Sequence, residues 1–206
     1  EAAAPVDITR ATTAIFYSIS NTQTGLRGVS FGDSLIKHVV ETLTAEFPRL
    51  RTFATLSPIP GFRAWLSKHA GAMLDRLDDK RRSELGRAVG FEPPQATHLL
   101  GAVDKALELD AKSPVRQMLL ECAAYYLGRE LQEGKPADPV ARFHLGNGAR
   151  VERLNWAGDP SGKGQKQSYG LMVNYLYDLK RIDKHRSLLA QGKVPVSGDI
   201  DSLCRD

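Results

Sequence analysis

The sequence predicts an α/β (α+β) fold built on a mixed sheet, with a helical insertion between its strands. Three observations carry this prediction: a strand–turn–helix–strand pattern over about the first 60 residues, a long helical stretch at 63–132, and short strand-like runs after it. The two strands of the first unit are expected to be parallel, because the helix between them returns the chain to the same end of the sheet.

The first unit begins with residues 14–20, whose nearly continuous apolar character is typical of a strand buried on both faces. After a glycine-rich turn, Asp33 is a suitable N-cap for a helix whose apolar residues recur on one face as far as Phe47. Pro48 ends that helix, and residues 51–56 are predicted to form the second strand.

Residues 63–132 are predicted to be helical throughout, with breaks. The proline pair that begins at Pro93 separates two helical patterns. A third helix starts with Ser113 as its N-cap and Pro114 at its first position. Cys122 lies inside this amphipathic helix and is therefore expected to be a core residue.

The remaining elements are predicted from local signals. Asn147–Gly148 predicts a hairpin turn between strands at 139–145 and 149–156. A polar loop then leads to a last helix over 171–179, which contains regularly spaced leucines and tyrosines. Residues 187–206 are too weakly patterned to assign an element.

Composition narrows the function classes. The 206 residues are 42% hydrophobic and 25% charged, which is typical of a soluble globular protein. The net charge of +4 is scattered rather than gathered into a basic stripe, so no nucleic-acid partner is expected, although a phosphorylated cofactor remains compatible. No apolar run approaches the ~20 residues of a membrane helix, and no secretory leader is visible, so no membrane association is expected.

The cysteines and histidines indicate a reducing compartment and no metal site. Cys122 and Cys204 cannot frame a disulfide scaffold and fit a reducing compartment, so a cytoplasmic location is expected. No histidine pair has the H-x-x-x-H spacing, and none has a cysteine partner, so no metal site is expected.

Two tempting motifs have the wrong spacing. Gly28–Gly32 matches the G-x-S-x-G nucleophile elbow of serine hydrolases, but about nine residues separate Ser30 from the predicted strand end at Ser20. The run Gly158–Lys163 resembles a phosphate-binding loop but has three residues between its glycines, not four.

The first glycine-rich turn is a better candidate for binding an anion. A row of backbone amides leading into a helix N-terminus can bind a pyrophosphate, and Gly32 would allow close approach. The alternative, a plain connection between strand and helix, stays equally open. The residues of this candidate site are Arg27, Gly28, Val29, Ser30, Phe31 and Gly32.

Two residues, His144 and Ser57, each have both a structural and a functional interpretation. His144 lies in an apolar predicted strand beside a tight turn, where a histidine is either a satisfied core residue or a placed acid or base. Ser57 is either a turn residue before Pro58 or a hydroxyl at the carboxyl end of a central strand, where open α/β sheets bind ligands.

Four stretches together resemble the C-terminal catalytic part of the malonyl-CoA decarboxylase family. They occur in the family's order across residues 14–180, and several adjacent residues match in each, which makes the resemblance specific. The stretches are Ala14–Val29, Leu56–Phe62 with its S-P-I-P-G-F motif, Asp138–Ala149 with F-H-L-G-N-G-A, and Leu171–Tyr177.

The resemblance implies a fold like that of the GNAT acyltransferases, in which coenzyme A binds where two parallel strands splay apart. Its pyrophosphate would lie on the turn that ends at Gly32. The family's catalytic serine falls on Ser57 and its catalytic histidine on His144, while Tyr177 falls on a tyrosine near the substrate. The implied reaction, part of fatty-acid metabolism, converts malonyl-CoA to acetyl-CoA and CO2 without a prosthetic group, because the coenzyme A thioester is the substrate.

The resemblance also implies a domain organisation. Residues 1–206 would form a partial acyltransferase-like catalytic domain that lacks its first strands and the family's N-terminal helical domain, which is linked to assembly into a homo-oligomer. We therefore expect the edge of the strand at 14–20 to be covered by other chain or left open. Two alternatives to the decarboxylase remain: an acyl-CoA-dependent acyltransferase and a non-catalytic acyl-CoA-binding protein.

Overall fold

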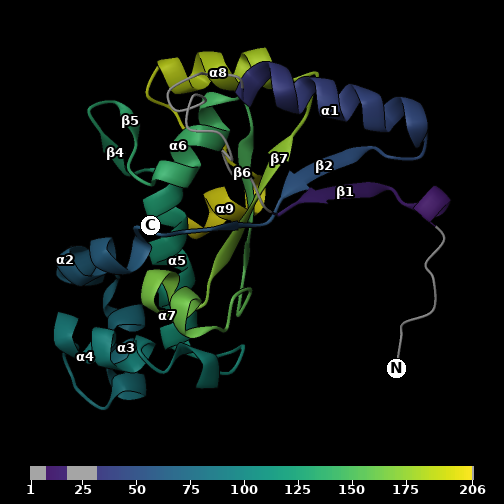
Figure 1. Ribbon diagram of the computed structural model, residues 1–206. Coiled ribbons are helices and arrows are strands. Elements are labelled where there is room, and N and C mark those ends of the chain that lie inside the picture. The colour runs from purple at the N-terminus through teal and green to yellow at the C-terminus, as the bar shows by residue number, and fades with distance from the viewer. Residues whose placement is uncertain (1–7, 18–31, 206) are drawn as a thin grey trace, which may run out of the picture.

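The computed structural model describes residues 8–17 and 32–205, and it combines helices with a mixed sheet (Figure 1). The strands are β1 (Thr13–Phe16), β2 (Thr52–Thr55), β3 (Ser57–Pro58), β4 (Leu131–Gln132), β5 (Lys135–Pro136), β6 (Arg150–Asn155) and β7 (Met172–Tyr177). The helices are α1 (Gly32–Glu46), α2 (Phe62–Asp75), α3 (Asp79–Val89), α4 (Ala96–Val103), α5 (Pro114–Gly128), α6 (Pro139–Gly146), α7 (Gly162–Ser168), α8 (Ile182–Ala190) and α9 (Gly198–Leu203).

The main sheet confirms the predicted α/β class. Its strand order is β1-β2-β7-β3, and β6 also pairs with β7. Strands β1 and β2 are parallel, as predicted, with Thr13 opposite Thr52 and Phe16 opposite Thr55. Strand β7 runs antiparallel to β2, β3 and β6, so it lies at the centre of the sheet.

The helical stretch predicted at 63–132 is confirmed as α2 to α5 as far as Gly128, whereas residues 131–132 form strand β4. Helix α5 forms as expected: Pro114 occupies its first turn, and the Ser113 side chain accepts a hydrogen bond from the amide of Arg116. Its apolar residues pack against α2, α4, α9 and β6. Cys122 is fully buried within it, which confirms the predicted core role.

The predicted strand at 139–145 is wrong, because this segment is helix α6. Asp138 caps the helix by accepting hydrogen bonds from the amides of Val140 and Ala141, and Pro139 follows as the first helical residue. The Asn147–Gly148 pair ends this helix instead of turning a hairpin: Asn147 is the C-cap, and Gly148 takes the left-handed conformation, with φ of +83°. The strand predicted at 149–156 is confirmed as β6.

The predicted helix at 171–179 is also wrong, because residues 172–177 form β7. Alternate residues of β7 are buried, namely Val173, Tyr175 and Tyr177, which is the two-residue period of a strand. The polar loop expected before it contains α7, whose N-cap is Ser161. Helices α8 and α9 occupy the region in which no element was assigned.

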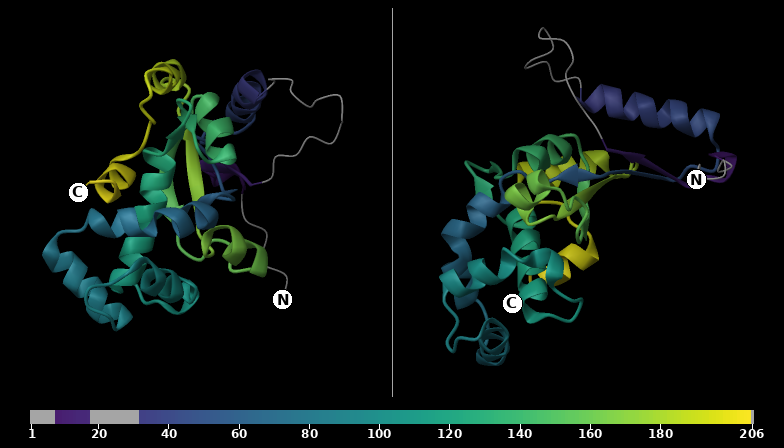
Figure 2. Two further views of the ribbon diagram at one scale, coloured as in Figure 1. Left: turned by 90° about the vertical axis from the view of Figure 1, so that its left-hand side faces the viewer. Right: turned by 60° about the horizontal axis from the view of Figure 1, so that its bottom comes forward.

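Strand β1 lies at one edge of the sheet rather than in its middle. Among the residues that the structure describes, β2 is its only strand partner. Ile15 is 45% exposed and the following Tyr17 is 79% exposed, so the predicted burial on both faces is wrong. Figure 2 shows β1 and α1 at the opposite side of the molecule from α2, α3 and α4.

Candidate active site

Three side chains from distant parts of the sequence meet on one face of the sheet. Ser57 is on β3, His144 on α6 and Tyr177 on β7. The distance from Ser57 Oγ to His144 Nε2 is 3.3 Å, and the distance from His144 Nδ1 to Tyr177 Oη is 2.8 Å. All three residues are buried. The structure thus brings together the three site residues that the sequence predicted.

The sheet register explains how the two strand residues come to share a face. Ser57 is paired with Val173, and Phe53 with Tyr177, across antiparallel strands. Paired residues point to the same side, and so do residues two apart on one strand. Ser57, Tyr175 and Tyr177 therefore lie in one row.

Helix α6 supplies the histidine from above this row. The His144 ring stacks on the Tyr175 ring, with centroids 4.6 Å apart and an interplanar angle of 25°. The ring also makes an edge-on contact with Tyr177. The imidazole is therefore held by packing as well as by its two hydrogen bonds.

A threonine that the sequence analysis missed completes the network. Ser57 Oγ and Thr55 Oγ1 are hydrogen-bonded at 2.9 Å. Thr55 Oγ1 also accepts a hydrogen bond from the backbone amide of Tyr175. The Thr55 carbonyl accepts from the side-chain amide of Asn174 at 2.6 Å. The available signal was the spacing, since Thr55 precedes Ser57 by two residues on an extended chain and so points to the same side.

Both ring nitrogens of His144 have a hydroxyl partner: Nε2 meets Ser57 and Nδ1 meets Tyr177. A hydroxyl can either donate or accept, so a neutral imidazole satisfies both contacts in either tautomer. The network thus holds the ring in one orientation.

Burial keeps the site uncharged. It lowers the pKa of His144 to about 4, so the imidazole is neutral near pH 7. Burial also raises the pKa of the Tyr177 hydroxyl above its usual range. A neutral, dry site of this kind disfavours a localised carboxylate and favours a transition state in which the charge is spread.

The candidate anion-binding turn is not tested in the same way. Residues Arg27, Gly28, Val29, Ser30 and Phe31 lie outside the described residues, and Gly32 is the first residue of α1. The elements on either side of the turn are those expected, since β1 precedes it, α1 follows it, and β2 lies parallel to β1. The anion site itself therefore stays a prediction.

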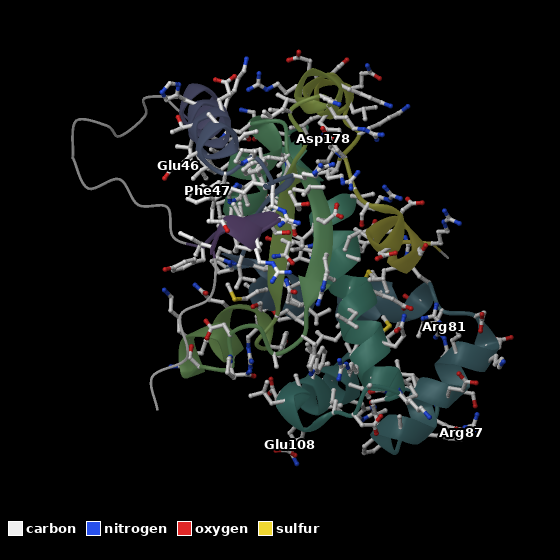
Figure 3. All side chains as sticks on the ribbon, turned by 90° about the vertical axis from the view of Figure 1, so that its right-hand side faces the viewer. Glu46, Phe47, Arg81, Arg87, Glu108 and Asp178 are labelled. Carbon is white, nitrogen blue, oxygen red and sulfur yellow. The ribbon has the colours of Figure 1, made fainter. Side chains whose placement is uncertain are left out.

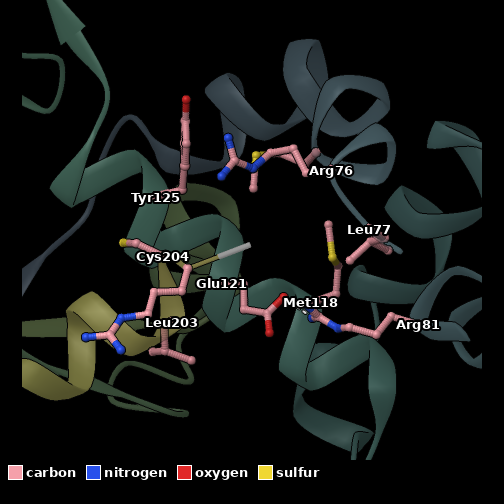
Figure 4. Close-up of a pocket in the computed structure, with 10 residues that line it drawn as sticks. Arg76, Leu77, Arg81, Met118, Glu121, Tyr125, Leu203 and Cys204 are labelled. Carbon is pink, nitrogen blue, oxygen red and sulfur yellow. Dashed lines mark hydrogen bonds and ion pairs between the residues drawn. The ribbon is translucent and has the colours of Figure 1, made fainter. Parts of the chain in front are cut away.

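A small pocket lies between α2, α3, α5 and α9 (Figure 4). It is a poor candidate for a substrate site. Its volume of about 20 Å³ holds little more than one water molecule. Arg81 and Glu121 form an ion pair across it, and the Arg76 guanidinium lies 4.6 Å from the Tyr125 ring centroid. In Figure 3, Arg81 lies away from Asp178, the residue after Tyr177.

Two kinds of feature are absent from the described part of the chain, namely a metal-binding cluster and a membrane-spanning helix. Within residues 8–17 and 32–205, no cluster of three or more histidine, cysteine, aspartate or glutamate side chains could hold a metal ion. None of the helices in these same ranges has the length and apolar character needed to cross a membrane.

The chain is similar to known proteins along nearly its whole length. The model of the malonyl-CoA decarboxylase C-terminal domain matches residues 1–206. Mitochondrial malonyl-CoA decarboxylase of Rattus norvegicus is 39% identical over 203 residues, covering 94% of this chain and 41% of the relative. The Mus musculus protein is 39% identical over 205 residues, with the same coverage.

Solved structures agree with the sequence comparison. The crystal structure of malonyl-CoA decarboxylase from Cupriavidus metallidurans matches with a TM-score of 0.83 and 49% identity, over 93% of this chain and 48% of that one. The enzyme from Rhodopseudomonas palustris matches with a TM-score of 0.74 and 42% identity, over 97% of this chain and 44% of that one. The chain spans less than half the length of these relatives. It belongs to the malonyl-CoA decarboxylase family and corresponds to the C-terminal domain of that family.

Proposed function

We propose that this protein converts malonyl-CoA to acetyl-CoA and CO2 as part of fatty-acid and malonate metabolism. The observation that carries the proposal is the 3.3 Å contact between Ser57 and His144, formed by two motifs that lie 87 residues apart in a member of this family. The contact is buried and uncharged, and such surroundings favour loss of CO2 from a malonyl thioester because they disfavour a localised carboxylate.

The proposed reaction breaks the bond between the carboxylate carbon and the α-carbon of the malonyl group. The electron pair of that bond moves into an enolate at the thioester, and CO2 leaves. A proton then returns to the α-carbon to give the acetyl group. The thioester accepts the electrons itself, so the coenzyme A thioester is the substrate and no prosthetic group is proposed.

Ser57 and His144 are proposed to act on the malonyl group as a pair. Their polar atoms position the carboxylate, and the pair delivers the proton to the α-carbon and is refilled from water. Tyr177 is proposed to support them, because its hydroxyl hydrogen-bonds Nδ1 of His144 and so fixes the orientation of the ring. Tyr177 would thereby keep Nε2 directed at Ser57.

The finer features of the family resemblance are part of the same proposal. Coenzyme A would bind the turn from Arg27 to Gly32 on a GNAT-like sheet, and the parallel pair β1–β2 with α1 between them supports this. We also propose that the intact protein is a homo-oligomer with neither nucleic-acid nor membrane partners. A cytoplasmic location is proposed from cysteine usage, whereas the animal relatives are named as mitochondrial proteins.

The test is incubation of the purified protein with malonyl-CoA and no acyl acceptor. We expect acetyl-CoA and CO2 in equal amounts, and formation of both at least about 100-fold slower in a matched sample that carries His144→Asn. Products that form only when an amine or alcohol is added would instead identify an acyltransferase. Tight coenzyme A binding without turnover would identify a non-catalytic binding protein.

A further inference from the structure

Asp138 is a fully buried carboxylate whose hydrogen bonds lie outside the Ser57–His144–Tyr177 network described above. One of its oxygens, Oδ1, accepts hydrogen bonds of 2.9 Å from the amides of Val140 and Ala141. The other, Oδ2, accepts from the amide of Gly61 at 3.4 Å. The Tyr126 hydroxyl also hydrogen-bonds this side chain.

Each carboxylate oxygen of Asp138 accepts hydrogen bonds from a segment that carries one of the two proposed catalytic residues, Ser57 or His144. Gly61 belongs to the S-P-I-P-G-F motif and follows Ser57 by four residues. Ala141 lies in α6 and precedes His144 by three residues, which is about one helical turn. A single carboxylate is therefore hydrogen-bonded both to the loop that follows Ser57, at Gly61, and to the start of the helix that carries His144.

We propose that Asp138 is a positioning residue that sets the Ser57–His144 distance by linking the loop at Gly61 to the start of α6. The inference rests on the proposed function, because the distance matters only if the pair does chemistry. Asp138 touches no reacting atom in this proposal. It acts by holding the segment around Gly61 and the start of α6 at a fixed distance from each other. Small errors in such geometry matter, because a misplacement of about 1 Å can reduce a rate about 100-fold.

The competing explanation is that Asp138 is only a helix cap. Asparagine caps helices about as well as aspartate, because its side-chain oxygen accepts the same amide hydrogen bonds. In Asp138→Asn, however, the Oδ2 position becomes an NH2 group, which cannot accept from the amide of Gly61. This variant therefore keeps the cap and removes the link to the loop.

Gly61 offers a second and independent way to disturb the link. A Cβ atom at Gly61 would overlap the hydroxyl oxygen of Tyr126, whereas the ring carbon that carries this hydroxyl lies at an ordinary contact distance of 3.4 Å. Gly61→Ala should therefore push the loop away from Tyr126. Adding Tyr126→Phe removes the overlapping oxygen and should let the loop return.

The experiment compares the purified wild type with Asp138→Asn, Gly61→Ala, Tyr126→Phe and the double variant Gly61→Ala/Tyr126→Phe. For Asp138→Asn we expect kcat for malonyl-CoA to fall at least about 10-fold while KM changes less than about 2-fold. We expect Gly61→Ala to lose activity similarly and the double variant to recover to the level of Tyr126→Phe. Nitrogen-15 NMR of the His144 ring should shift in Asp138→Asn.

Several outcomes would overturn the inference. One is a folded Asp138→Asn protein with wild-type kcat and an unchanged His144 ring signal, which would leave Asp138 as a cap alone. If Asp138→Asn does not fold, the Gly61 and Tyr126 variants decide, and no recovery in their double variant overturns the link. If the wild type forms no acetyl-CoA, the proposed function fails, yet the His144 ring signal still tests the link separately.

Discussion

The two sides of the sheet differ in how firmly their functional residues are held. At the β3–β7 side, Ser57, His144 and Tyr177 are at most 5% exposed, and His144 is hydrogen-bonded to each of the other two. At the β1 edge, Ile15 is 45% and Tyr17 79% exposed. The difference teaches that the proposed chemical groups are fixed by packing within this domain, whereas β1, the described strand that precedes the predicted coenzyme A turn in the sequence, is thinly packed.

The largest expected effect comes from breaking the packed side. Ser57→Ala or His144→Asn should each reduce turnover of malonyl-CoA by about 100-fold or more, as removal of an acid–base group typically does. Coenzyme A affinity should remain near the wild-type value in both variants, because neither residue belongs to the predicted binding turn, Arg27 to Gly32. Steady-state kinetics and calorimetry check the two parts, and near-normal acetyl-CoA production in either variant would refute the assignment.

Burial of His144 also predicts how stability depends on pH. The pKa of His144 is about 4 in the folded protein and about 6.5 when unfolded, so between these values the unfolded state binds more protons. Stability should therefore fall by up to about 3 kcal/mol as the pH drops from 6.5 to 4. Urea unfolding across this range should show the loss in wild type and not in His144→Asn; parallel curves for the two proteins would contradict the burial argument.

A substitution on the other side sharpens the comparison. Gly32→Val should weaken coenzyme A binding about 10-fold, because a side chain there would block approach of the pyrophosphate to the backbone amides. At saturating substrate, kcat should stay close to wild type. Calorimetry on the folded variant tests this, and an unchanged coenzyme A affinity would exclude the turn as the binding site.

The smallest effect is expected from the outer member of the network. Tyr177→Phe removes one neutral hydrogen bond to His144 Nδ1 but leaves the packed ring in place. Such a bond contributes about 1 kcal/mol, so kcat should fall roughly 5-fold. Kinetics on the variant check this, and a loss as large as that of His144→Asn would mean that Tyr177 acts on the substrate directly.

Local sequence patterns predicted the first unit and the helical insertion, because their strong periodicity and caps agree with the packing. They failed at α6 and β7 for a physical reason. Leu171, Met172, Tyr175 and Leu176 fit a helical period, but the same segment also offers a strand period in Leu171, Val173, Tyr175 and Tyr177. Only pairing with β2, β3 and β6 decides between the two. At α6 the Asp138–Pro139 start signal outweighed the apparent hairpin turn.

The site was only partly predictable for a related reason. Ser57, His144 and Tyr177 lie in motifs that can be recognised from sequence, although His144 and Tyr177 were assigned to the wrong element types. Thr55 lies outside the four matching stretches, and Asp138 lies in one of them only as a helix start signal, so the importance of both arises from contacts across the fold. The assembly state stays a prediction.

The most direct test of the central claim is a double-variant comparison of Ser57→Ala, His144→Asn and both together. Residues that act as one unit show non-additive losses, because removing either member already disables the pair. We therefore predict that kcat of the double variant falls about as far as that of the worse single variant. A double variant whose loss equals the product of the two single losses would show that Ser57 and His144 act independently, and would contradict this account.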